Sequence, residues 1–259
     1  MPLPAMTFTF LGTGTSQGVP MIGCKCQVCT SKNPKDKRLR SSVMVEDNLT
    51  RIVIDSGPDF RQQMLRENVD ALDGVLFTHE HKDHIAGLDD VRAFNYLQKK
   101  PMDVYATVHV QQALRREFHY IFSGDTYPGI PRLTIHTIDE NYFMAGSLKI
   151  VPVPVMHLNL PVFGFRIGDF SYITDANFID ENSKSILRGS KTIVLNALRK
   201  EKHVSHFNLK EAIEIVEELK PDNAYFTHIS HQLGLHDEIN GDLPPYIQCA
   251  FDGLKITIN

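Results

Sequence analysis

Six consecutive residues place three imidazoles and an aspartate carboxylate within one short stretch of chain. They follow the apolar run 74–78 directly and form an H-x-H-x-D-H pattern, His79-Glu80-His81-Lys82-Asp83-His84. In an extended loop, side chains two residues apart point to the same side, so His79 and His81 can face one point. Asp83 and His84 can turn toward a second point nearby. Imidazole nitrogens and carboxylate oxygens are ligands of cations such as Zn²⁺, so the stretch predicts a metal site.

Three further candidate ligands stand at the ends of strand-like runs elsewhere in the chain. They are His157 after the run 148–155, Asp175 after the run 170–174, and His228 after the run 223–227. Any one of them alone would most often be an ordinary polar residue. Together with the histidine-rich loop, however, they form the set expected when a sheet scaffold brings strand ends to one edge. The sequence therefore predicts that widely separated residues converge on one metal site.

Three of the four cysteines form a second cluster near the N-terminus. Cys24, Cys26 and Cys29 lie within six residues, whereas Cys249 stands alone and is expected to be a buried small apolar residue. A chain of this length needs no disulfide framework, because it can build a large core. Crowded thiols therefore indicate a second metal site in a reducing compartment such as the cytoplasm. Three thiolates leave a tetrahedral Zn²⁺ one ligand short.

The elements that must position these residues are readable from hydrophobic periodicity. Strands are expected at 6–12, 42–46, 51–55, 74–78, 103–108, 133–138, 148–155, 162–167, 170–174, 191–196, 223–227 and 254–259. Helices are expected at 59–68, 87–99, 111–122, 180–188 and 208–219. Two sheets covered by helices would bury the apolar faces of these elements, so the fold class is a layered α/β arrangement.

Size and charge narrow the classes of function. The chain has 259 residues, 42% of them hydrophobic and 22% charged, and a net charge of −4. It is expected to form a single domain over 1–259, because no stretch has the composition of a linker. The acidic balance disfavours broad nucleic-acid binding. No apolar stretch is long enough to span a bilayer, and the N-terminus lacks the basic region of a secretory signal.

The ligand series resembles that of the metallo-β-lactamase superfamily over essentially the whole chain. The resemblance implies a four-layer αββα sandwich with two catalytic metal ions. In that arrangement His79, His81 and His157 would bind one ion, Asp83, His84 and His228 would bind the other, and Asp175 would bridge them. Asp83 is expected to be a catalytic residue as well as a ligand. Asp55, at the end of the run 51–55, matches the family's acidic residue behind the ligands and would orient a histidine.

Two further features narrow the resemblance within the superfamily. The cysteine cluster at about 18–41, together with His231, is similar to the structural zinc site of cyclic-phosphate phosphodiesterases of the carbon–phosphorus lyase pathway. His206 stands just ahead of an expected helix, where phosphodiesterases of the superfamily place a histidine that protonates the leaving alkoxide. Histidine is the side chain type most often used for such proton transfer, and His203 is a weaker competitor for the role. True β-lactamases usually carry a cysteine in the position of Asp175.

The expected activity is therefore hydrolysis of a small or cyclic phosphodiester by water that two divalent ions, Zn²⁺ or Mn²⁺, activate between them. One further Zn²⁺ would be structural, and a homodimer is implied by the resemblance alone. Three alternatives stay open. They are an endoribonuclease that processes tRNA 3′ ends, a thioesterase or other acyl hydrolase of the same fold, and a metal-binding protein without turnover.

Overall fold

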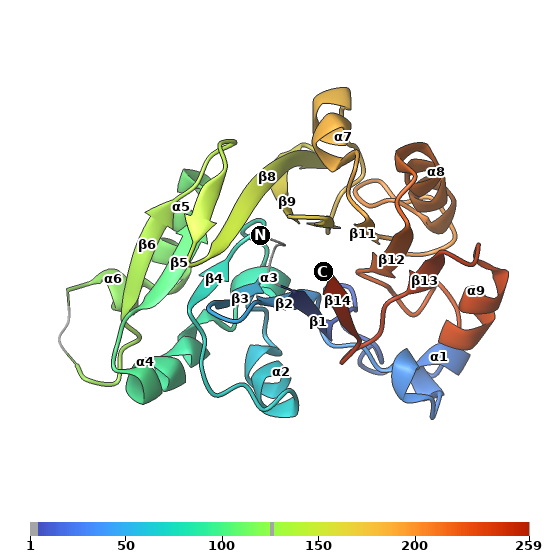
Figure 1. The fold of residues 1–259 in the computed structure, drawn as a ribbon. Helices are drawn as coiled ribbons and strands as arrows, with labels where there is room; N and C mark the ends of the chain where they lie inside the picture. Colours follow the sequence, from blue (N-terminus) through green and yellow to red (C-terminus); the bar gives the residue numbers. More distant parts are fainter. Residues whose placement is uncertain (1–4, 125–126, 259) are drawn as a thin grey trace.

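The computed structural model describes residues 5–124 and 127–258, and two seven-stranded sheets lie at its centre (Figure 1). The first sheet has the order β14-β1-β2-β3-β4-β5-β6. Its pairings are antiparallel from β14 to β3 and parallel from β3 to β6. Its strands are β1 (Met6–Gly12), β2 (Ser42–Glu46), β3 (Arg51–Ile54), β4 (Gly74–Leu76), β5 (Met102–Ala106), β6 (Leu133–Thr137) and β14 (Lys255–Ile258).

The second sheet is also mixed and has the order β13-β12-β11-β10-β9-β8-β7. Strands β7 to β10 pair antiparallel, and β10 to β13 pair parallel. The strands are β7 (Phe143–Ala145), β8 (Leu148–His157), β9 (Leu160–Ile167), β10 (Phe170–Tyr172), β11 (Thr192–Asn196), β12 (Asn223–Thr227) and β13 (Ile247–Cys249).

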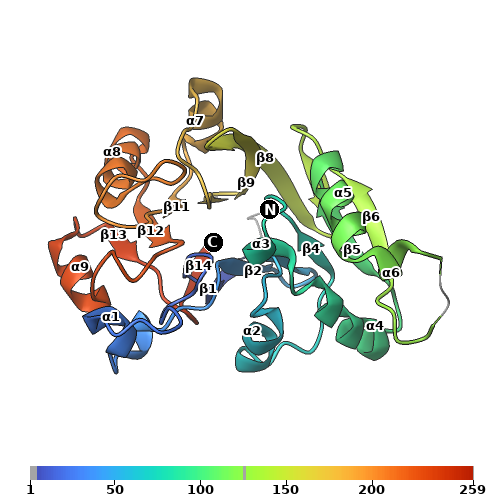
Figure 2. The same cartoon turned by 180° about the vertical axis from the view of Figure 1, so that it is seen from behind.

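Helices cover the outer face of each sheet. The first sheet packs on α2 (Phe60–Arg66), α4 (Arg92–Gln98) and α5 (Val108–Glu117), and the second packs on α7 (Glu181–Leu187) and α8 (Leu209–Leu219). Shorter helices lie in the connections: α1 (Gln27–Thr30), α3 (Lys82–Ile85), α6 (His119–Phe122) and α9 (His236–Asp242). Figure 2 shows α3 near the middle of the molecule, in front of β2. The layers run helix, sheet, sheet, helix, which confirms the predicted αββα sandwich.

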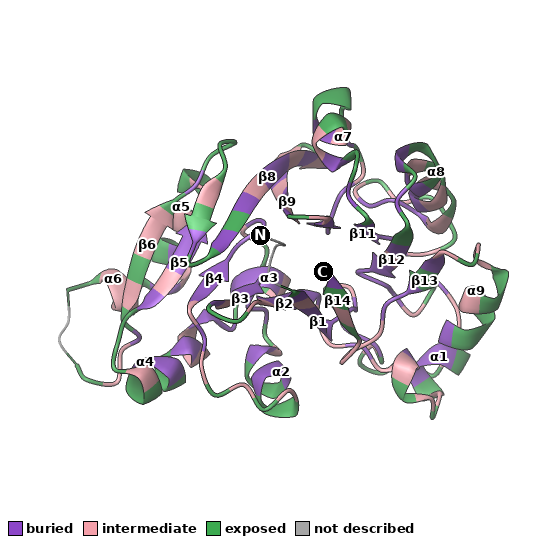
Figure 3. Ribbon diagram, viewed as in Figure 1, coloured by how far each residue is buried: buried purple, intermediate pink, exposed green. Residues whose placement is uncertain are grey.

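Strand periodicity explains the layering. In β2, Val43 and Val45 join the core between the two sheets, whereas Met44 points outward to the core under the helices. Figure 3 shows burial concentrated in the strands and exposure on the outer faces of the helices. Between the sheets, the rings of Phe8 and Phe170 stack with their centroids 3.7 Å apart. Each sheet thus buries both faces, which is why many of its strands are almost continuously apolar.

The predicted elements are largely found, with differences at their ends. The expected helix 87–99 begins as a 3-10 turn, Leu88–Val91, before α4. The expected helix 111–122 starts earlier, because the Thr107 hydroxyl accepts from the backbone N–H of Val110, and it breaks at Phe118. The expected strand 254–259 is β14, and Asn259 lies outside the described residues.

Short elements among the described residues were not predicted from the sequence: α1, α3, α9, β7, β13 and the 3-10 turn Pro34–Asp36. Each has three to seven residues, too few for a periodic signal. Within the described ranges, no helix has the length and apolar character needed to cross a bilayer.

Candidate metal centre

The candidate ligands come from strand ends in both sheets. The histidine-rich loop follows β4 of the first sheet, and Asp83 and His84 lie on the single turn of α3. In the second sheet, His157 is the last residue of β8, Asp175 follows β10, and His228 follows β12. The predicted convergence is therefore present in the structure, and it joins one edge of each sheet.

Asp175 lies at the meeting point of three groups of donor atoms. Within each group all the donor atoms lie within 4.8 Å of one another. The groups are Asp83, His84, Asp175 and His228; His79, His81 and Asp175; and His157, Asp175 and His206. The first group agrees with the set expected for one ion and its bridge. His157, expected beside His79 and His81, has its ring centroid 5.8 and 5.1 Å from theirs and groups with His206 instead.

Asp55 lies fully buried behind two of the ligands and fixes their ring nitrogens. Its Oδ2 accepts from Nδ1 of His84 at 2.7 Å and from the Thr78 hydroxyl at 2.8 Å. Because that hydroxyl already donates to Asp55, it accepts from Nδ1 of His79, 2.9 Å away. The Asp55 carboxylate thus occupies Nδ1 of His84 directly and Nδ1 of His79 through the Thr78 hydroxyl. Their Nε2 atoms are left as lone-pair donors toward the centre.

Neighbouring segments hold His157 and His228. The Ser205 carbonyl accepts a hydrogen bond from Nδ1 of His157 at 2.7 Å. Nε2 of His157 therefore carries the lone pair that can bind a metal ion. Nδ1 of His228 lies 3.2 Å from the Ser41 hydroxyl and 3.1 Å from Asp175 Oδ1. Its Nε2 lies 3.3 Å from the Thr15 hydroxyl. Each ring is therefore oriented by a residue outside the ligand series.

Three site residues have left-handed backbone conformations although they are not glycine. The φ values are 64° at Asp55, 56° at Asp175 and 54° at His228. Each residue follows the last residue of a strand within three positions. Aspartate and histidine are among the residue types that tolerate this region best, but it still costs on the order of 1 kcal/mol or more. Strained turns thus aim donor side chains at the centre.

The charges in the centre favour a bound cation. Burial lowers the pKa of His84, but Asp175, Asp83 and Asp55 outweigh it and hold that pKa well above the usual histidine range. The cluster therefore carries negative charge that needs a positive partner. Burial, reinforced by His84, lowers the pKa of His79 far below that range, so His79 is neutral as a ligand must be.

Two buried ring nitrogens give the sharpest test of fit. The Nε2 atom of His79 has no hydrogen-bond partner among the described residues, and that of His84 faces only carboxylate oxygens, of Asp83 at 3.2 Å and of Asp175 at 3.3 Å. Buried polar atoms are rarely left unpaired, because the loss of hydration is costly. Both atoms point to the cluster around Asp175, so a divalent ion would supply the missing partner. The residues present fit the divalent metals of this fold.

His206 lies at the edge of the same cluster. Its Nε2 is 3.2 Å from Asp175 Oδ2, and its Nδ1 is 3.0 Å from the Ser205 hydroxyl. His203, the weaker candidate, has its Nδ1 3.2 Å from Nδ1 of His206 but does not reach Asp175 in the structure. The structure therefore places His206, and not His203, against the centre.

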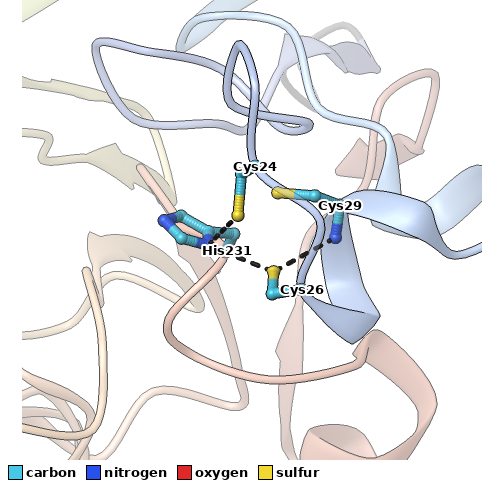
Figure 4. A group of neighbouring side chains, drawn as sticks. All are labelled: Cys24, Cys26, Cys29 and His231. Atoms are coloured by element: carbon cyan, nitrogen blue, oxygen red, sulfur yellow. Dashed lines mark hydrogen bonds between the residues drawn. The ribbon is translucent and has the colours of Figure 1, made fainter.

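His231 lies beside the three clustered cysteines, as predicted (Figure 4). All three thiols are free, and their sulfurs and a ring nitrogen of His231 lie within 4.8 Å of one another. Nδ1 of His231 is 3.6 Å from Sγ of Cys24 and 3.3 Å from Sγ of Cys26. The backbone N–H of Cys29, followed by His231, lowers the pKa of the Cys26 thiol to about 6. Three sulfurs and one imidazole nitrogen form a complete tetrahedral zinc set.

Sequence reasoning missed the residues that support the ligands: Thr78, Ser41, Thr15 and Ser205. Serine and threonine are common in loops, so composition marks none of them. Thr78 and Ser205 carried the only usable signal, since each directly precedes a candidate histidine in the sequence.

Comparisons with known proteins agree with this geometry. The family model described as beta-lactamase superfamily domain matches residues 50–229. A crystal structure of a diphosphatase from the PhnP family has 41% sequence identity, covers 98% of both chains and gives a TM-score of 0.92. Human tRNase Z, short form, covers 98% of this chain and 99% of its own at 18% identity and a TM-score of 0.70, which shows the fold alone.

One curated relative carries a different name. The octanoyltransferase of Porphyromonas gingivalis is 38% identical over 257 residues, which are 98% of this chain and 52% of that protein. This chain thus spans about half the length of that relative.

The chain belongs to the beta-lactamase superfamily domain family, the metallo-β-lactamase fold with its metal-dependent hydrolases. Within that family it is similar over nearly its whole length to the diphosphatase of the PhnP family.

Proposed function

We propose that this chain is a phosphodiesterase that acts on small or cyclic phosphodiesters. Two divalent ions, Zn²⁺ or Mn²⁺, would lie around Asp175, and one structural Zn²⁺ would lie at the Cys–His cluster. The observation that carries the proposal is the 3.2 Å approach of His206 Nε2 to Asp175 Oδ2. An alkoxide leaving group needs a proton donor at such a place. The diphosphatase described for the PhnP family supports phosphoryl chemistry.

In the proposed reaction, His206 and Asp83 would each carry one proton transfer. Divalent ions in this site would neutralise charge on phosphoryl oxygens and activate water. Hydrolysis would form a bond from a water oxygen to phosphorus as the bond from phosphorus to the leaving alcohol breaks. His206 would give its proton to the departing oxygen. Asp83 has the most exposed carboxyl of the centre, 12% against 3% for Asp175 and 0% for Asp55, so it is the carboxylate best placed to pass the proton that the water would lose to solvent.

An acyl hydrolase is the second candidate, because one relative is called an octanoyltransferase. That name describes a protein about half of which this chain matches. A thioester releases a thiolate that needs little protonation, so this chemistry would leave His206 without a role. The position of His206 therefore favours the phosphodiesterase.

A substrate panel with metal-loaded protein tests the proposal. The panel comprises bis(4-nitrophenyl) phosphate, a 2′,3′-cyclic nucleotide, a ribose cyclic phosphate, a nucleoside diphosphate, precursor tRNA and an octanoyl thioester. We expect turnover of the small phosphodiesters, sensitive to chelator and insensitive to moderate salt. Preferred cleavage of precursor tRNA with steep salt dependence would replace the proposal with a ribonuclease. Turnover of the thioester alone would replace it with an acyl hydrolase.

A further inference from the structure

A hollow of about 380 Å³ lies beside the histidine-rich loop. Its walls come from that loop, from the start of α5, from β8 and β9, and from the segment between β6 and β7. Among the lining residues that the structure describes, none is a candidate metal ligand, so the hollow is separate from the metal centre. Ligand pockets in proteins have volumes of roughly 300–1,000 Å³, so the hollow can hold a small organic molecule.

The inner walls of the hollow are apolar. Val110 of α5 and Val162 of β9 line it and are buried, with 2% and 3% of their surface exposed. The half-buried side chains of Pro154, Leu160 and Phe163 add further carbon surface. Because removal of apolar surface from water favours binding, these walls suit the hydrocarbon body of a ligand.

The carboxylates of the hollow are not neutralised by basic side chains. Glu80 and Glu140 line it, and no lysine or arginine is among the described lining residues. Oε1 of Glu80 lies 2.8 Å from Nε2 of the exposed His109, whereas its Oε2 has no hydrogen-bond partner in the described part of the chain. Glu140 is exposed and forms no hydrogen bond or ion pair within residues 5–124 and 127–258. The hollow therefore favours a positively charged ligand.

The start of α5 does not reverse this preference. The Thr107 hydroxyl caps the helix by accepting from the backbone N–H of Val110 at 3.3 Å. Glu80, bonded to His109 in the first turn of the same helix, already places negative charge at the positive end of the helix dipole. An anionic ligand would meet both carboxylates of the hollow and be repelled.

We infer that this hollow binds a small organic cation, an amine whose hydrocarbon body lies against Val110 and Val162 and whose ammonium group faces Glu80 and Glu140. An ammonium group forms charge-assisted hydrogen bonds with carboxylates, and the apolar walls receive the rest of the molecule. The site adjoins the loop that carries His79 and His81 but is distinct from the place of a reacting phosphoryl group. The inference does not depend on the proposed function.

Three probes of similar size test this inference. The probes are 2-phenylethylamine, 2-phenylethanol and 3-phenylpropanoate, which share a phenyl body and differ in charge. Their Kd values for the metal-loaded protein are measured by NMR titration. Saturating inorganic phosphate is present throughout, so that the amine does not compete for the metal ions. We expect the amine to bind about tenfold or more tightly than the alcohol, and the carboxylate to bind most weakly.

Two kinds of variant separate the charge from the apolar walls. Glu140→Gln should reduce the preference for the amine over the alcohol roughly threefold, and the double variant with Glu80→Gln should reduce it to less than about twofold. Leu160→Trp narrows the hollow and should weaken the amine and the alcohol alike. Asp139→Asn is the matched control, because Asp139 is an exposed acidic neighbour of Glu140 that does not line the hollow. It should leave all three Kd values unchanged.

Equal binding of the amine and the alcohol to the wild type would overturn the inference. A preference that stays the same in Glu140→Gln and in the double variant would do so too, and so would the absence of amine binding while phosphate is present. Every readout is a binding constant measured without turnover. A failure of the proposed reaction on the substrate panel is therefore distinguishable from a failure of this site.

Discussion

At the scale of single residues, the environment of each histidine decides its role. His79 and His84 offer Nε2 because Asp55 and Thr78 occupy their Nδ1 atoms. His157 offers Nε2 because the Ser205 carbonyl occupies its Nδ1. His206 differs, because its Nδ1 faces the Ser205 hydroxyl and His203 while its Nε2 faces Asp175. Under the proposed function, a ring at the edge of the cluster would be placed to give its proton to a leaving group.

Replacing His206 by alanine should affect substrates according to their leaving group. On an alkyl phosphodiester, whose alkoxide must be protonated, we expect kcat/KM to fall roughly 100-fold or more. On bis(4-nitrophenyl) phosphate, whose nitrophenolate leaves without a proton, the fall should be less than about tenfold. The measurement is kcat/KM for both substrates at matched metal content. Equal losses on the two substrates would remove the acid role.

At the scale of elements, the segment that leads from β1 into the cysteine-rich loop is tied to the strand end that carries His228. Backbone hydrogen bonds join Ile229 N–H to the Thr13 carbonyl at 2.9 Å and Thr15 N–H to the Ile229 carbonyl at 3.1 Å. His231 then reaches the cysteines only three residues beyond His228. A zinc ion bound there would fix the loop against β12 and so stiffen one side of the metal centre.

Cys26→Ser should therefore act mainly on stability. Removing one of four ligands weakens the zinc site, and its contribution to folding is lost with the metal. We expect Tm to fall by roughly 5–10 °C, measured by calorimetry, with one zinc ion fewer per chain by elemental analysis. Cys249→Ala is the control, because that buried thiol lies outside the cluster and its loss should leave zinc content unchanged. An unchanged Tm in Cys26→Ser would contradict a structural zinc.

At the scale of the whole molecule, the centre exists only because two sheets pack together. The loop after β4 belongs to the first sheet, whereas His157, Asp175 and His228 belong to the second. The stacked rings of Phe8 and Phe170 belong to the apolar core that holds the two sheets together. The two kinds of metal site differ in solvent access and in ligands, and they should lose metal separately.

We expect three metal ions per chain in fully loaded protein and one after treatment with a mild chelator. The ion that stays is held by thiolates, which bind zinc tightly. Elemental analysis before and after treatment gives the count, and circular dichroism shows whether the fold persists. Activity should vanish with the first two ions and return when Zn²⁺ or Mn²⁺ is added. Simultaneous loss of all ions, or a single ion at saturation, would contradict this division.

Much of the site was predictable, because ligand chemistry restricts residue types and strand ends restrict their places. The H-x-H-x-D-H stretch and the three strand-end donors meet around Asp175, and the Cys–His set forms a group of its own, although His157 groups with His206 and not with His79 and His81. Supporting residues were not predictable, because a hydroxyl such as Ser41 becomes important only when folding places it beside His228.

The sequence alone determined which atoms can bind metal and that two sheets must carry them, because donor chemistry and hydrophobic periodicity are local properties of the chain. Only the tertiary structure decided that the donor atom of His157 groups with that of His206 and not with those of His79 and His81. It also decided the left-handed turns at Asp55, Asp175 and His228. These outcomes depend on distances between segments far apart in the chain, and such distances are set by how the two sheets pack.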